Sequence, residues 1–149
     1  MVDLGSGAGL PGIPLAIALP SVRLVLVEAR TRRGAFLEMA VDELGLANVT
    51  VHVGRIQDLD EQADVCLARA FGPPLTSWRA AERVLRPGGH LVYFAGATWS
   101  AGDHERELRA AGIRAEICAP RSFNSQGPVV MMGGFSSTDG SQDDGPKHA

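Results

Sequence analysis

The sequence contains only two cysteines, few aromatic residues and no lysine before Lys147. Cys66 and Cys118 stand alone, with neither a C-x-x-C pair nor metal-ligand spacing, so we expect both thiols to be buried and reduced. The four histidines are also scattered and predict no metal site. The apolar stretch over residues 10–19 is broken by two prolines and is too short to cross a bilayer. These absences exclude disulfide-stapled, metal-binding and membrane-spanning classes, and we expect a cytoplasmic, membrane-free monomer.

Length and composition fit one soluble domain. A chain of 149 residues, 45% hydrophobic and 21% charged, can bury a single core. It has no room for the second domain with which dehydrogenases usually bind their substrate. After residue 135 large apolar side chains are absent, so we expect a domain over residues 1–135 and a disordered tail over residues 136–149. Because only Met1 and Val2 precede the first strand's acid, we expect either a short first strand or a sequence that lacks N-terminal helices.

Positive charge is concentrated locally, although the formal net charge is −3. Arg30, Arg32 and Arg33 form a cluster, and Arg55 and Arg69 follow later apolar runs. Guanidinium groups at these places suit the phosphates of a nucleic acid. The alternative for the cluster is a solvated helix face that pairs with acids of the same helix, and the sequence leaves both readings open.

Apolar, β-rich runs alternate with amphipathic segments along the chain. The expected strands are residues 2–4, 23–27, 49–53, 65–68, 90–94, 115–118 and 129–132, and the expected helices are residues 13–19, 32–44, 75–85 and 103–111. Gly45, the run Pro87-Gly88-Gly89 and Gly112 are expected to end the last three helices. This alternation predicts an α/β fold with a doubly wound, mostly parallel, seven-stranded sheet.

The most informative segment is the glycine-rich run that follows the first strand. Gly5, Gly7 and Gly9 allow a sharp turn and a close approach of a ligand to the backbone. One template is G-x-G-x-x-G for a dinucleotide, with Glu28 placed 19 residues after Gly9. The other places Asp3 two residues before the first glycine, where a carboxylate receives an ammonium group and repels a pyrophosphate. We favour the second, which predicts S-adenosylmethionine as the cofactor.

Residues at the strand ends complete the predicted site, because ligands of doubly wound sheets bind beyond the carboxyl ends of the strands. Glu28 is placed to accept the ribose hydroxyls. Ile56 is expected to pack on adenine, while the backbone of Ile56 and Gln57 reads the edge of the base. Arg69 is expected to hold the cofactor carboxylate or a substrate phosphate, or else to form an ion pair with Asp3 or Glu28.

No side chain in the sequence stands out as a catalytic base, and we assign no catalytic residue. A ring nitrogen such as N7 of guanine already exposes a lone pair, so its methylation requires no prior loss of a proton. Proximity and orientation then supply most of the acceleration.

These residues resemble the GidB or RsmG family, which methylates N7 of a guanine in small-subunit ribosomal RNA with S-adenosylmethionine. The resemblance rests on the run from Asp3 to Ile17, on Arg33 with Phe36-Leu37, on Glu43-Leu44-Gly45-Leu46, on Gly54-Arg55 and on Ala68-Arg69-Ala70. It implies a class I methyltransferase fold and cofactor contacts at Gly5, Leu10, Ile56, Gln57 and Arg69. It also implies ribosomal RNA or the small ribosomal subunit as the partner, with Arg33 and Arg69 facing the substrate.

The sequence departs from the family pattern at three places. It has no helical region before the first strand, it carries Ala95 and Gly96 where a lysine is common, and residues 124–128 of the last hairpin carry no basic side chain. Two alternatives therefore stay open, a small-molecule methyltransferase and a truncated, non-catalytic relative that only binds the cofactor.

Overall fold

The computed structural model describes residues 1–119 and 127–134 of the chain. Its strands are β1 (Val2–Leu4), β2 (Leu24–Glu28), β3 (Val49–Val53), β4 (Ala63–Arg69), β5 (Leu85–Phe94), β6 (Ile113–Ala119) and β7 (Val129–Gly134), and its helices are α1 (Gly12–Ala18), α2 (Thr31–Glu43), the 3-10 turn η1 (Ile56–Asp58), α3 (Pro74–Glu82) and α4 (Ala101–Ala110). The predicted tail over residues 136–149 and residues 124–126 of the predicted hairpin lie outside the described part.

All seven strands belong to one sheet, in the order β3-β2-β1-β4-β5-β7-β6. The neighbouring strands β3, β2, β1, β4 and β5 all run parallel to one another, whereas β7 runs antiparallel to both β5 and β6. The predicted doubly wound, mostly parallel sheet is thus confirmed, with an antiparallel hairpin at one side. The chain winds outward in both directions from β1, so the carboxyl ends of β1 and β4 form the switch point at which such sheets bind ligands.

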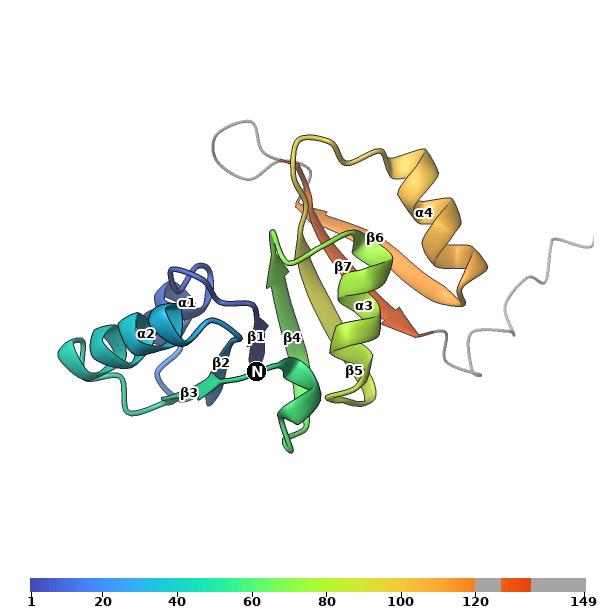
Figure 1. The fold of residues 1–149 in the computed structure, drawn as a ribbon. Helices are drawn as coiled ribbons and strands as arrows, with labels where there is room; N and C mark the ends of the chain where they lie inside the picture. Colours follow the sequence, from blue (N-terminus) through green and yellow to red (C-terminus); the bar gives the residue numbers. More distant parts are fainter. Residues whose placement is uncertain (120–126, 135–149) are drawn as a thin grey trace, which may run out of the picture.

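Helices cover both faces of the sheet, as Figure 1 shows, with α1 and α2 beside β1–β3 and α3 and α4 beside β4–β7. The alternation of side chains along β2 divides the core in two. Leu24 and Leu26 pack with Leu37 of α2 in one cluster. Val25 and Val27 pack in the other cluster, which also holds Trp78 and Ala81 of α3. Every residue of β2 is buried as a result, which is typical of a central parallel strand.

In the second of the predicted amphipathic helices, over residues 32–44, not every apolar side chain is buried. Leu37 is fully buried and Val41 packs against the same cluster, but Leu44 is 52% exposed. Leu44 is the C-cap of α2, where the helix ends.

The prediction that Pro87-Gly88-Gly89 ends the third helix is wrong. Helix α3 ends at Glu82, and the amide of Ala63 at the start of β4 donates to the carbonyl of Val84, which draws the chain into the sheet. Leu85 then pairs with Ala63 and His90 with Val65, so the residues between Leu85 and His90 form an irregular bulge in β5. Gly88 takes the positive φ of 80° that this bulge requires.

The two cysteines differ in exposure. Cys66 is buried in β4, as expected, but Cys118 is exposed on the edge strand β6, so the expectation of two buried thiols is wrong. Burial raises the pKa of Cys66 to about 12, which suppresses its reactive thiolate.

We therefore expect a thiol-specific disulfide reagent at pH 8 to modify one thiol per native chain rapidly, and the second only after unfolding. The variant Cys118→Ser should lose the rapid phase, which identifies the reactive group. Two rapid phases in the native wild-type chain would contradict the burial of Cys66.

No helix within residues 1–119 and 127–134 combines the length and apolar character that a membrane crossing requires.

Candidate functional site

The glycine-rich run forms a tight loop at the carboxyl end of β1. Gly5, Gly7 and Gly9 have φ values of 64°, 58° and 84°, a region that favours glycine. A Cβ at Gly5 would lie only 2.8 Å from Cδ2 of Phe71, so the ring packs where a side chain would otherwise stand. The amide of Ser6 donates to the carbonyl of Val27 over 2.9 Å and fixes the loop to β2. The turn predicted from the sequence is confirmed.

Glu28 ends β2 and holds the loop from the other side. Its Oε2 accepts a hydrogen bond from the amide of Gly7 at 3.0 Å, and its Oε1 accepts one from the amide of Arg30 at 2.9 Å. The side chain is 5% exposed. Each carboxylate oxygen keeps a further lone pair, so Glu28 can still accept a hydroxyl from a ligand.

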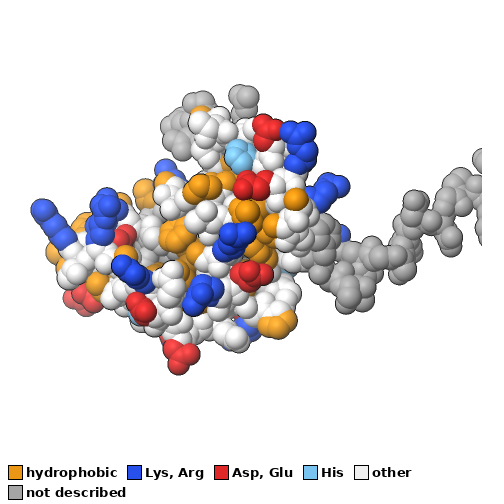
Figure 2. Space-filling view, turned by 45° about the vertical axis from the view of Figure 1, so that its right-hand side comes forward, with side chains coloured by type: hydrophobic (Ala, Val, Ile, Leu, Met, Phe, Trp, Pro, Cys, Tyr) orange, Lys and Arg blue, Asp and Glu red, His pale blue; other side chains and the backbone are white. Residues whose placement is uncertain are grey.

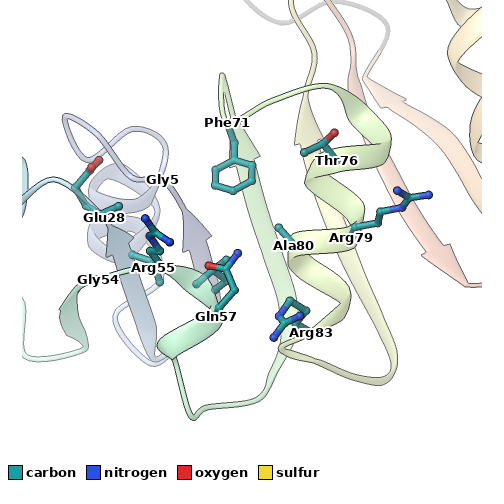
Figure 3. A pocket seen from close by; sticks show the side chains of 13 residues that line it. Gly5, Glu28, Gly54, Arg55, Gln57, Phe71, Thr76, Arg79, Ala80 and Arg83 are labelled. Atoms are coloured by element: carbon teal, nitrogen blue, oxygen red, sulfur yellow. The ribbon is translucent and has the colours of Figure 1, made fainter.

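A cavity of about 500 Å³, here called the first cavity, opens beside Glu28 (Figure 3). Four of the residues predicted to bind the cofactor line it together: Gly5, Glu28, Ile56 and Gln57. Ile56 is 6% exposed and forms part of the apolar floor, and Gly54 beside it donates its amide to the carbonyl of Glu28 at 3.0 Å. An apolar floor next to a carboxylate that accepts hydroxyls suits a nucleoside.

A second cavity, also about 500 Å³, lies on the other side of Gly5, which lines both. It brings together Leu10 and Gly7 of the loop, Arg33 of α2 and Arg69 at the end of β4. Among the described residues neither arginine has an ion-pair partner, so the alternative pairing of Arg69 with Asp3 or Glu28 is not formed. A ligand that occupied both cavities would therefore cross the glycine loop and meet two cations.

The turn after β4 contributes residues to both cavities. Ala70 is the one non-glycine residue of the described part with a positive φ, at 53°, a conformation that costs an L residue about 1 kcal/mol. Arg69 and Ala70 line the second cavity, whereas Phe71 lines the first. The left-handed turn thus sends consecutive side chains into different cavities, which is consistent with strain retained at a functional site.

Two of the predicted contact residues lie behind the loop rather than in a cavity. Asp3 is 1% exposed, and Gly9 is also buried; neither lines the first or the second cavity. A Cβ at Gly12 would lie 2.7 Å from Oδ2 of Asp3, and this oxygen has no hydrogen-bond partner. Burial raises the pKa of Asp3 from 3.8 to about 6, and the nearby Ser6 hydroxyl and Gly12 amide oppose part of this rise. Oδ2 of Asp3 is thus a buried carboxylate oxygen without a hydrogen-bond partner, directly behind the glycine-rich loop. Such an oxygen suits the positively charged group of a cofactor.

Sequence reasoning missed several residues of the site. Phe71 contacts Gly5, and Tyr93 donates its hydroxyl to the carbonyl of Gly72 at 3.0 Å while lining the second cavity. Arg79 of α3 and Arg83, the C-cap residue of α3, line the first cavity. Their spacing of four was visible in the sequence, but the position of α3 against β5 and beside this cavity depends on packing between distant segments.

Two solved structures with the same fold are named as methyltransferases. A SAM dependent methyltransferase from Aquifex aeolicus has a TM-score of 0.69 and 18% identity, covering 88% of this chain and 80% of that chain. A precorrin-6y C5,15-methyltransferase from Geobacter metallireducens GS-15 has a TM-score of 0.65 and 21% identity, covering 92% and 79%. This likeness establishes the fold of class I S-adenosylmethionine-dependent methyltransferases, as the sequence predicted.

Sequence comparison identifies the family. The GidB family, described as rRNA small subunit methyltransferase G, matches residues 1–119, and the chain belongs to this family. The protein named ribosomal RNA small subunit methyltransferase G in Mycolicibacterium gilvum is 37% identical over 93% of this chain and 64% of that protein. The protein of the same name in Kineococcus radiotolerans is 47% identical over 75% of this chain and 43% of that protein. The chain thus spans less than two thirds of the length of these curated relatives.

Proposed function

We propose that the chain is the cofactor-binding part of an S-adenosylmethionine-dependent methyltransferase that acts on N7 of a guanine in small-subunit ribosomal RNA. The observation that carries the proposal is the pair of cavities joined at Gly5. The first offers a hydroxyl acceptor and an apolar floor, and the second offers two arginines. The names of the relatives support the substrate class.

Each predicted residue has a distinct role in this proposal. Glu28 accepts the ribose hydroxyls, Ile56 packs on the adenine, and the backbone at Ile56 and Gln57 hydrogen-bonds the base edge. Arg69 binds the cofactor carboxylate from the second cavity. Asp3 neutralises the ammonium group from behind the loop, either directly after a small loop movement or through a water molecule.

When bound, the cofactor supplies a sulfonium methyl group that a lone pair can attack in line. The protein then has to bring the ring nitrogen to this methyl group and exclude competing water. Arg33 serves the first task by binding a substrate phosphate at the mouth of the second cavity. Because the guanine N7 lone pair carries no proton, the site needs no general base.

The test is transfer of a labelled methyl group to isolated small ribosomal subunits that lack the modification. We expect one methyl group per subunit, released as 7-methylguanine when the RNA is digested. Label in a small molecule but not in RNA would favour the small-molecule alternative. Cofactor binding without any transfer would favour the non-catalytic alternative. Either outcome would refute the proposed substrate.

We further propose that the protein works as a monomer in the cytoplasm, where ribosomal subunits are assembled. Light scattering after size-exclusion chromatography should give a mass near 15.7 kDa for this chain. A mass twice as large would contradict the proposal.

A further inference from the structure

Three arginines surround the first cavity and have no role in the proposed cofactor site. Arg55 follows β3, whereas Arg79 of α3 and Arg83, the C-cap residue of that helix, lie on the other side of the opening. The guanidinium group of Arg79 extends past the helix, away from Arg55 (Figure 3). We call these three residues the arginine rim. Arg83 comes four positions after Arg79, and both line the cavity together with Thr76 and Ala80.

The positive charge of the rim is not compensated. Three other arginines of the described part form ion pairs with acids: Arg23 with Glu61, Arg86 with Asp64 and Arg106 with Asp103. Within residues 1–119 and 127–134 the rim residues form no such pair, and Glu82 of α3 is paired with neither Arg79 nor Arg83. Such uncompensated charge stands out in a chain whose net charge is −3.

The lining of the first cavity holds one carboxylate, that of Glu28, which accepts a backbone hydrogen bond at each oxygen. Among the described residues, Glu28 forms no ion pair with these arginines. Figure 2 shows blue basic side chains, red carboxylates and apolar surface close together in the middle of the visible face. The three rim arginines are exposed, and apolar residues such as Ile56 and Ala80 line the same cavity.

Arginines also mark the second cavity, where Arg33 and Arg69 stand without an acidic lining residue. Gly5, which lines both cavities, lies between this pair and the arginine rim. Arginines thus occur in both cavities, on either side of Gly5. A polyanion that bound on both sides would cross the glycine loop and cover the first cavity.

Resting on the proposed function, we propose that the arginine rim binds backbone phosphates of the RNA strand beside the target nucleotide. The planar guanidinium group binds phosphate oxygens through two parallel hydrogen bonds, and phosphate contacts fix the position of a strand without reading its bases. The RNA then lies across the opening of the first cavity and shields the bound nucleoside. The rim is a substrate-positioning surface distinct from the cofactor contacts.

The test is the salt dependence of RNA binding by the double variant Arg79→Gln/Arg83→Gln of the full 149-residue chain. Glutamine keeps helix propensity and length while removing the charge. The probe is a fluorescein-labelled 12-nucleotide single-stranded RNA, titrated from 50 to 200 mM KCl with S-adenosylhomocysteine present. Each lost phosphate contact should reduce the slope of log K against log salt by about 0.7, so we expect a reduction of about 1.4 and at least tenfold weaker binding at 50 mM.

The matched control is Arg23→Gln/Arg86→Gln. Both residues lie at the amino ends of strands, on the edge of the sheet opposite the site, and the double variant removes the same charge. It should bind RNA with nearly the wild-type slope. The single variant Arg55→Gln tests the rim from a different element and should reduce the slope by about 0.7.

Equal losses in the rim and control variants would overturn the proposal, because they would reflect net charge alone. A changed affinity for S-adenosylhomocysteine with an unchanged RNA slope would also overturn it, since the arginines would then serve the cofactor. Absence of RNA binding by the wild-type chain would do the same. The readout does not require methyl transfer. If the wild-type chain transferred no methyl group but the rim variants still reduced the salt slope of RNA binding, the rim would be confirmed as an RNA-binding surface. The proposed reaction would then be refuted.

Discussion

Replacing Glu28 by glutamine should weaken the binding of S-adenosylhomocysteine about a hundredfold. Two ribose hydroxyls that donate to a carboxylate contribute about 3 kcal/mol more to the binding free energy than the same hydroxyls facing a neutral amide. The amide also offers one acceptor and one donor where the backbone N–H groups of Gly7 and Arg30 both require an acceptor. One of these N–H groups therefore faces an NH₂ group, which should lower the free energy of unfolding by about 1–3 kcal/mol.

Calorimetric titration measures the affinity, and urea denaturation measures the unfolding free energy. Glu38→Gln is the matched control, because Glu38 is an exposed residue of α2 and lines neither cavity. It should change neither quantity appreciably. If Glu28→Gln bound S-adenosylhomocysteine as tightly as the wild-type chain does, Glu28 would not be the ribose ligand.

Replacing Asp3 by asparagine should stabilise the ligand-free protein and weaken its binding to the cofactor. Above pH 6 the carboxylate is ionised in both the folded and the unfolded state, and burial disfavours the ionised form in the folded state. The neutral amide avoids this cost. With a folded pKa of about 6 against 3.8, the difference in unfolding free energy is about 3 kcal/mol at pH 7.5.

The sign of the pH dependence distinguishes this explanation from a simple packing effect. As the pH falls from 6 to 3.8, the folded state takes up a proton before the unfolded state does, so the wild-type chain gains stability relative to Asp3→Asn. The two chains should therefore unfold at nearly the same urea concentration at pH 3.8 or below. A stability difference that stayed constant from pH 7.5 to pH 4 would show that the carboxylate's charge is not its cause.

Binding should change in the opposite direction to stability. Asparagine cannot neutralise an ammonium group, and we expect the affinity for S-adenosylhomocysteine to fall by about tenfold or more, as for a lost charge-assisted hydrogen bond. Asp42→Asn, an exposed change on α2, provides the control for removal of one negative charge. Unchanged affinity in Asp3→Asn would mean that Asp3 only supports the loop.

The sequence predicted the fold because local signals and global arrangement agree. The alternation of β-rich runs and amphipathic helices leaves few topologies other than a doubly wound sheet, and the glycine loop marks its switch point. The same rule placed Glu28, Ile56 and Gln57 at one edge, where the structure joins them around the first cavity. Residues at strand ends were therefore predictable without any knowledge of side-chain packing.

The remaining features depend on contacts between distant segments. Phe71 contacts Gly5 because Ala70 takes a left-handed conformation. An alanine in the sequence does not predict this conformation. Asp3 lies beneath Gly12 and lines neither cavity, a position that depends on how the loop packs over β1 and could not be read from the spacing of the acid and the glycines. Cys118 is exposed because β6 is an edge strand, and an edge position cannot be read from the strand's own residues.

The central claim is that the cavities joined at Gly5 hold the nucleoside and the amino-acid part of one cofactor. Calorimetric titration of the 149-residue chain with S-adenosylhomocysteine, and separately with NAD, tests it most directly. We expect saturable binding of one S-adenosylhomocysteine per chain and no binding of NAD. Binding of NAD without binding of S-adenosylhomocysteine would contradict the claim.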